Sequence, residues 1–265
     1  MKIAVAGKGG VGKTTVCAGL AHAFARQGRK VMAVDADPNN CLGPALGFPE
    51  ELVARVTPIC EMRELLCDRA GTSQGGGFFA LDPEVDDLIE RFSVMHAGIR
   101  LLVMGTITQG GAGCVCPEST VLRALTRQVV TGAEAVLLMD MEAGLEHLGR
   151  GTSRHMDALL IVVEPSIASV RTVERIGALA RDLGIASLSV VANKVRNEGD
   201  VAFVREHAKL PVIGTVPFLE GLGWPGREEP GAEFRQAIDA IKHSLEREVT
   251  ARAGTASPTE DDERA

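Results

Sequence analysis

The chain has 265 residues, of which 45% are hydrophobic and 24% are charged, and its formal net charge is -7. This balance is typical of a soluble globular protein, and the acidic charge argues against nucleic acid as the main partner, which usually requires a basic surface. No apolar run approaches the roughly 18 residues that a membrane span needs, and the apolar run Ile3–Ala6 is too short for a signal peptide. We therefore expect a cytoplasmic protein that binds neither nucleic acid nor a membrane.

Aliphatic stretches alternate with helical patterns along the chain. Strands are expected at 2–6, 30–35, 99–104, 135–140, 158–163, 187–192 and 211–216. Helices are expected at 13–27, at 57–69 (opened by Thr57-Pro58), and at 117–130, 169–183, 199–208 and 231–249. Such alternation produces βαβ units, so the sequence predicts an α/β fold with a mostly parallel central sheet flanked by helices on both faces. We expect one domain at 1–250, followed by a disordered acidic tail at 251–265.

A glycine-rich segment follows the first expected strand and precedes the first expected helix. The run from Gly7 to Thr14 fits G-x-x-x-x-G-K-[ST], the pattern of a phosphate-binding loop. Glycines let backbone N–H groups curl around phosphates, and the helix N-terminus adds partial positive charge. Lys13 is expected to contact the β- and γ-phosphates, and the Thr14 hydroxyl to coordinate Mg²⁺. The residues expected to bind the nucleotide here are Gly9, Gly10, Val11, Gly12, Lys13, Thr14 and Thr15.

The loop contains a second lysine, Lys8, which an ordinary phosphate loop does not need. The run GKGGVGKTT resembles the deviant Walker A signature of a P-loop ATPase family that includes the nitrogenase iron protein, the MinD and ParA ATPases and nickel-insertion ATPases. The resemblance implies a homodimer that closes around ATP, with Lys8 of each subunit reaching the phosphates bound by the other. The alternative is that Lys8 is a solvated surface side chain.

Carboxylates end two of the expected strands, at Asp35 and Asp37 and again at Asp140. In the resembled family the second Asp of such a first segment orients the attacking water and the first lies near Mg²⁺, which are the roles expected for Asp37 and Asp35. Asp140 resembles a Walker B residue that holds Mg²⁺ through water. Gly144 completes a D-x-x-x-G pattern whose backbone N–H contacts the γ-phosphate. The alternative for Asp37 and Asp140 is a helix-capping role.

The segment Asn193-Lys194-Val195 resembles the start of the N-K-x-D guanine-binding motif, but the next residue is Arg196. Arginine cannot accept the hydrogen bonds that guanine donates, so we expect ATP rather than GTP. The resemblance implies that Asn193, Lys194 and Pro217 lie at the adenine.

Two cysteines, Cys114 and Cys116, stand in a glycine-rich stretch before Pro117. A helix N-terminus at this proline would favour thiolates, which are soft ligands for nickel or zinc. Two thiolates cannot complete a four-coordinate site, but a symmetric dimer would supply four. The spacing alone leaves open whether the pair binds metal. The resemblance implies Ni²⁺ or Zn²⁺ shared across the dimer. The other cysteines are expected to pack in the protein, namely Cys17, Cys41, Cys60 and Cys67.

Several further segments occur in the order found in the nickel-insertion branch of the family. They are Met104-Gly105, the cysteine pair, residues 140–152, Glu164-Pro165 and the run 193–197. From Met1 to about residue 250, the chain resembles the CooC-type ATPases that mature the active-site cluster of carbon monoxide dehydrogenase. The resemblance implies an ATP-hydrolysing metallochaperone whose client is the catalytic subunit of that enzyme.

One residue departs from the branch, because Glu142 stands where a small residue is usual. A carboxylate there would alter Mg²⁺ binding or the rate of hydrolysis more than the fold. Two other functions stay open. A MinD- or ParA-like positioning or partitioning switch would need a membrane helix or a DNA-binding surface. An electron-transfer ATPase like the nitrogenase iron protein would need widely separated cluster cysteines.

Overall fold

The computed structural model describes residues 1–61, 91–105, 134–142, 156–185, 187–220 and 231–253. The strands are β1 (Lys2–Ala6), β2 (Lys30–Ala36), β3 (Ser93–His96), β4 (Ile99–Val103), β5 (Ala135–Met141), β6 (Ala158–Val163), β7 (Leu188–Val195) and β8 (Val212–Pro217). The helices are α1 (Lys13–Arg26), α2 (Leu42–Ala45), α3 (Glu50–Val53), α8 (Ile167–Asp182), α9 (Glu198–His207) and α10 (Ala232–Ala253), with a 3₁₀ turn at Ile59–Glu61.

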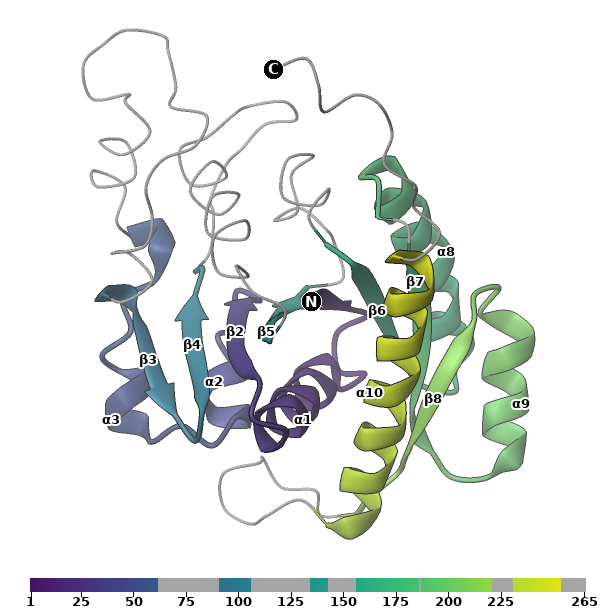
Figure 1. The fold of residues 1–265 in the computed structure, drawn as a ribbon. Coiled ribbons are helices and arrows are strands. Elements are labelled where there is room, and N and C mark those ends of the chain that lie inside the picture. The colour runs from purple at the N-terminus through teal and green to yellow at the C-terminus, as the bar shows by residue number, and fades with distance from the viewer. Residues whose placement is uncertain (62–90, 106–133, 143–155, 186, 221–230, 254–265) are drawn as a thin grey trace, which may run out of the picture.

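The strands form one sheet in the order β3-β4-β2-β5-β1-β6-β7-β8 (Figure 1). All neighbouring pairs are parallel except β3 and β4. The expected α/β fold with a mostly parallel sheet is therefore confirmed. Because the parallel strands share one direction, the ends of β1, β2, β5, β6 and β7 meet at one edge, where ligands bind in such sheets.

Apolar side chains alternate between the two faces of the sheet, and helices lie against both faces (Figure 1). On β1, Ile3 and Val5 pack on the face covered by α1, α2 and α10. Ala4 and Ala6 pack on the opposite face, which α8 and α9 cover over β6 and β7. Burial of both faces explains why the strands are continuous aliphatic runs rather than alternating patterns.

The short elements were not predicted. The hairpin of β3 and β4 turns at Ala97 and Gly98, both with positive φ (48° and 77°), which suits a two-residue hairpin turn. Helices α2 and α3 have four residues each, too few for a helical period to appear in the sequence. Of the helix expected to begin at Thr57-Pro58, the structure describes the turn Ile59–Glu61. The expected helix at 117–130 lies outside the described residues.

Helix α10 confirms the expected apolar stripe of the last helix. Phe234, Ile238, Ile241 and Leu245 are all buried against α1 and the sheet. The helix continues to Ala253, so the first residues of the expected tail are helical, and the rest of it is not described. Across the described part of the chain, no helix combines the length and apolarity that a membrane crossing would require.

Candidate nucleotide-binding site

The phosphate loop connects β1 to α1 at the sheet edge where the strands end. Gly10 and Gly12 have φ angles of 82° and 91°, and residues other than glycine rarely adopt such angles. Gly12 is the N-cap of α1 and provides no side-chain hydrogen bond to the first turn. The free N–H groups of that turn and the helix dipole therefore make an anion-binding position.

Gly7 begins the loop in close contact with the neighbouring strand. Its φ is 154°, and a Cβ at this position would overlap the carbonyl oxygen of Val162 in β6. Only glycine allows the chain to leave β1 at this angle while β1 and β6 keep their backbone pairing. The direction of the loop is thus set by the sheet itself.

Asp140 lies on β5 beside β1, in register with Val5. It is completely buried, and neither carboxylate oxygen has a hydrogen-bond partner among the described residues. Burial is the largest cause of its raised pKa, which is about 7. The nearby Thr14 hydroxyl lowers the pKa in part, although it is not within hydrogen-bonding geometry of the carboxylate. A buried carboxylate without a partner is costly, and a divalent cation would remove that cost. Thr14 and Asp140 therefore fit Mg²⁺, which prefers hard oxygen ligands.

Asp35 lies on β2 opposite Asp140, in register across the strand pair. Its two oxygens accept the backbone N–H groups of Asp37 at 3.2 Å and Leu42 at 2.8 Å. Burial raises its pKa to about 6 against these two hydrogen bonds. Asp35 therefore holds the segment after β2 in place, while its expected position beside Mg²⁺ stays a prediction.

Asp37 lies next to the lysine of the phosphate loop. Its Oδ2 is 3.8 Å from Lys13 Nζ, and the two side chains are only 10% and 7% exposed. Its Oδ1 accepts hydrogen bonds from the backbone N–H and the side-chain amide of Asn39. The carboxylate is thus fixed on one side and faces Lys13 on the other, a position compatible with orienting water beside a bound phosphate.

Asn193 and Lys194, expected at the adenine, contact the backbone of the phosphate loop. Asn193 Nδ2 donates to the carbonyl oxygen of Val11 at 2.7 Å, and Lys194 Nζ donates to that of Gly10 at 2.6 Å. Lys194 also pairs with Glu164 at 3.1 Å. Glu164 was expected only as part of the segment Glu164-Pro165, and no contact in the site was predicted for it, although its place directly after β6 puts it at this edge. An adenine contact for Asn193 or Lys194 stays a prediction.

Arg196 and Phe218 form a stacked pair beyond the ends of β7 and β8. The guanidinium carbon lies 4.1 Å from the ring centroid, within the range of a cation–π interaction. The backbone N–H of Phe218 donates to the carbonyl oxygen of Val195, which fixes Pro217 and Phe218 at the end of the sheet. A cation occupies the place where a guanine-binding motif needs a carboxylate.

Other predicted residues are exposed or not described. Lys8 is exposed on the loop, and Glu142 is exposed directly after β5. Gly144, Cys114 and Cys116 lie outside the described residues. In the part of the chain that is described, no three His, Cys, Asp or Glu side chains gather as a metal-binding group. Cys17 is buried, whereas Cys41 and Cys60 are partly exposed, and none of these three described cysteines forms a disulfide.

Comparison with known proteins identifies the family of the chain. The family profile of the CobQ/CobB/MinD/ParA nucleotide binding domain matches residues 2–230. The chain is 47% identical to the carbon monoxide dehydrogenase accessory protein CooC of Rhodospirillum rubrum, over 82% of this chain and 84% of that protein. It is 45% identical to an uncharacterised ATP-binding protein of Methanocaldococcus jannaschii, over 83% of this chain and 86% of that protein.

The fold has close counterparts among solved structures. The MinC:MinD cell division protein complex of Aquifex aeolicus superposes with a TM-score of 0.66 at 22% identity, covering 98% of this chain and 97% of that chain. At this identity the likeness concerns the fold alone. Together with the profile match and the CooC similarity, it shows that the chain is a P-loop ATPase that belongs to the CobQ/CobB/MinD/ParA nucleotide-binding family.

Proposed function

We propose that this ATPase is a cytoplasmic metallochaperone that couples ATP hydrolysis to nickel insertion into the active-site cluster of carbon monoxide dehydrogenase. One observation carries the proposal, namely the 47% identity to the accessory protein CooC across 82% of the chain. ATP hydrolysis at the nucleotide site would drive the insertion, and Cys114 and Cys116 are the proposed metal ligands.

Each described residue of the nucleotide site has its own proposed role in ATP hydrolysis. The loop amides and Lys13 would bind and neutralise the β- and γ-phosphates. Thr14 and Asp140 would hold Mg²⁺, which supplies charge neutralisation on the phosphates when bound. Asp37, fixed by Asn39 and facing Lys13, would orient the attacking water. Little covalent chemistry is needed, because phosphoryl transfer depends mainly on positioning and electrostatics.

Lys8 is proposed to link ATP binding to dimerisation. It is exposed on the loop, so in one subunit it is free to reach phosphates held by another. Lys8→Ala should keep ATP binding in the monomer within about threefold, since Lys13 and the loop amides remain. The variant should fail to dimerise with a non-hydrolysable ATP analogue in analytical ultracentrifugation.

A matched control is Lys30→Ala, which removes an exposed lysine at the opposite end of the strands. This variant should dimerise like the wild type. An ATP-dependent dimer that forms equally well with Lys8→Ala would contradict the proposed link.

The cysteine pair is proposed to bind nickel at the dimer axis. Cys114→Ser/Cys116→Ser should lose stoichiometric Ni²⁺ in equilibrium dialysis, because a hydroxyl is a poor ligand for a soft site. ATP hydrolysis without client should stay within about twofold, since neither residue belongs to the phosphate site. Cys41→Ser, which removes another partly exposed thiol, should bind nickel normally. Unchanged nickel binding in the double variant would exclude the metal role.

The whole function is tested by reconstitution. Nickel-free carbon monoxide dehydrogenase should gain activity with nickel, Mg-ATP and this protein, and should gain little when ATP is replaced by a non-hydrolysable analogue. A client activated equally without the protein, at limiting nickel, would overturn the proposal.

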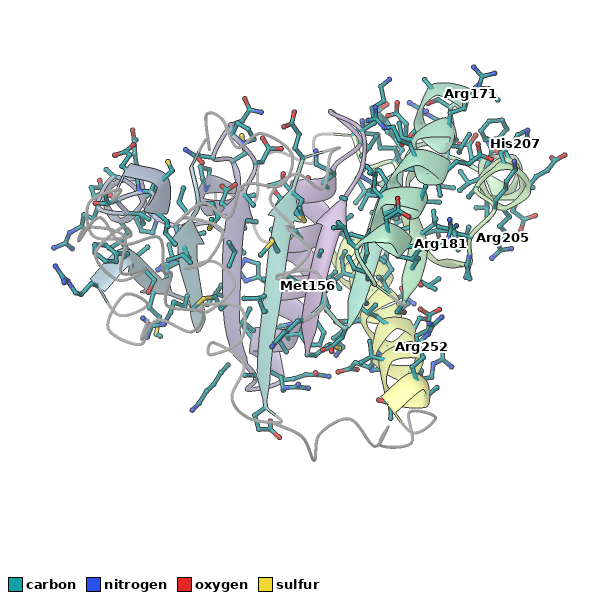
Figure 2. All side chains as sticks on the ribbon, turned by 90° about the horizontal axis from the view of Figure 1, so that it is seen from above. Met156, Arg171, Arg181, Arg205, His207 and Arg252 are labelled. Carbon is teal, nitrogen blue, oxygen red and sulfur yellow. The ribbon has the colours of Figure 1, made fainter. Side chains whose placement is uncertain are left out.

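A MinD- or ParA-like switch is the second candidate, favoured by the shared fold. The apolar stripe of α10 is buried in the core, so this helix does not offer it to a membrane. Arg171 of α8 and His207 of α9 lie at the outer surface of the molecule (Figure 2), but the same helices expose Glu174 and Glu206. The described surface of these helices is therefore mixed in charge. Co-sedimentation with anionic vesicles or retention on DNA would favour this candidate.

A further inference from the structure

Lys194 occupies a strained position near the end of β7. Its φ of 59° lies in the left-handed region, which residues with side chains seldom adopt. The register with β8 shifts between the pairs Ala192–Thr215 and Val195–Pro217, so β7 has one more residue than its neighbour over this stretch. The strand therefore contains a β-bulge at Asn193 and Lys194.

The bulge directs two consecutive side chains to the same face. In a regular strand, Ala192 and Lys194 would share a face because side chains alternate. Here Ala192 and Val195 both pack on the face that includes α8 and α9. Asn193 and Lys194 are left to face the phosphate loop, which both of them contact. Strain of this kind persists where the surrounding structure fixes it, and it gathers at functional sites.

The two side chains bind the carbonyl oxygens of two consecutive loop residues. Asn193 is buried and donates to Val11, and Lys194 donates to Gly10. In a planar trans peptide, the C=O and the following N–H point in opposite directions. Holding the carbonyls of Gly10 and Val11 on the Asn193 side therefore turns the N–H groups of Val11 and Gly12 away from it. The Val11 N–H makes a long hydrogen bond within the loop, 3.4 Å to the carbonyl oxygen of Lys8.

Glu164 fixes the ammonium group of Lys194. Its Oε2 lies 3.1 Å from Nζ, and the side chains of Glu164 and Lys194 are 32% and 38% exposed. An ion pair this open to solvent stabilises the fold very little. Its main consequence is geometric, because it holds Nζ at the position where it also reaches the carbonyl oxygen of Gly10.

We propose that Asn193, Lys194 and Glu164 form a brace that sets the amide groups of the phosphate loop toward the triphosphate. All three are positioning residues, since they act on the phosphates through the loop and do not recognise the base. The inference concerns the ATPase site itself and is independent of the proposed nickel function.

The test separates phosphate binding from base binding with a ligand that has no base. Lys194→Met should weaken ATP binding and inhibition by tripolyphosphate by the same factor, about ten- to a hundredfold, as expected for loss of a charge-assisted hydrogen bond. The selectivity for ATP over GTP should not change. A base contact would instead weaken ATP alone, so unchanged tripolyphosphate inhibition overturns the brace.

Two further variants complete the experiment. Lys209→Met is the matched control, because Lys209 also has positive φ (53°) and pairs with an exposed glutamate, Glu174. It should leave both ligands unaffected. Glu164→Gln should weaken both ligands by a smaller, equal factor, and should add nothing to Lys194→Met, since the two residues act in one chain of contacts. Fully additive losses in the double variant would contradict the coupling between Glu164 and Lys194. If Lys194→Met does not fold, Glu164→Gln alone gives the same comparison of ATP with tripolyphosphate.

Discussion

Replacing Asp140 with Asn should make the protein more stable without Mg²⁺ and nucleotide, and should nearly abolish ATP hydrolysis. The wild type buries a carboxylate that has no hydrogen-bond partner among the described residues. We expect the substitution to raise the free energy of unfolding by about 2 kcal/mol at pH 8, because an amide costs less to bury than a charge. Hydrolysis should fall by about a hundredfold or more, since a Mg²⁺ ligand is lost.

The gain in stability should depend on pH in a defined direction. The folded pKa of Asp140 is about 7, above its ordinary value of 3.8, so between these values the folded protein binds more protons than the unfolded chain. Wild-type stability attributable to this group is highest at low pH and is lost as pH rises toward 7. Asp35, with a pKa of about 6, acts in the same direction. The advantage of Asp140→Asn should therefore shrink toward pH 5.

Urea unfolding with a metal chelator at pH 5 to pH 8 measures this advantage, and phosphate release measures hydrolysis. Asp182→Asn is the control, because it changes an exposed carboxylate of α8 and should alter neither quantity. An Asp140→Asn protein that is less stable than the wild type at pH 8 would show that the carboxylate has a partner in the folded state.

Replacing Gly7 with Ala should destabilise the fold and weaken ATP binding together. The added Cβ would overlap the backbone oxygen of Val162, and the backbone would keep a φ of 154°. A backbone atom in a sheet cannot move aside as a side chain can, so β1 and β6 would have to separate. We expect a loss of about 3 kcal/mol from overpacking and strain and ATP binding weakened at least about tenfold, as measured by urea unfolding and calorimetry.

Gly9 provides the comparison within the same loop. A Cβ at Gly9 meets no atom within 4 Å, and the residue is exposed. Gly9→Ala should therefore leave the free energy of unfolding within about 0.5 kcal/mol of the wild type. Equal destabilisation by both substitutions would mean that loop flexibility, rather than the contact with β6, explains the result.

The long strands and helices were predictable because each one carries its own signal. An aliphatic run such as 158–163 has no stable place except inside a sheet covered on both faces. The hairpin strand Ser93–His96 carries no such signal, since none of its residues is fully buried and its pairing depends on β4. The short helix Leu42–Ala45 depends on a contact outside itself, because the backbone N–H of Leu42 donates to the Asp35 carboxylate.

The candidate site likewise contains residues that the sequence predicted and contacts that it did not. The phosphate loop and the carboxylates at 35, 37 and 140 were identified because their residue types follow strands at fixed spacing. The contacts of Lys194 were not foreseen, because a regular strand would point this side chain away from the loop. A bulge and a positive φ decide its direction, and neither is expressed in a pattern of residue types.

The order of the strands places two groups of residues on opposite sides of the phosphate loop. Beside β1, one neighbour is β5, and β2 follows it, so Asp35, Asp37 and Asp140 come from residues before 143. The other neighbour is β6, followed by β7, so Glu164, Asn193 and Lys194 come from residues after 155. In a chimaera of two relatives joined between these halves, the rate of ATP hydrolysis should follow the N-terminal parent. The affinity for polyphosphate should follow largely the C-terminal parent.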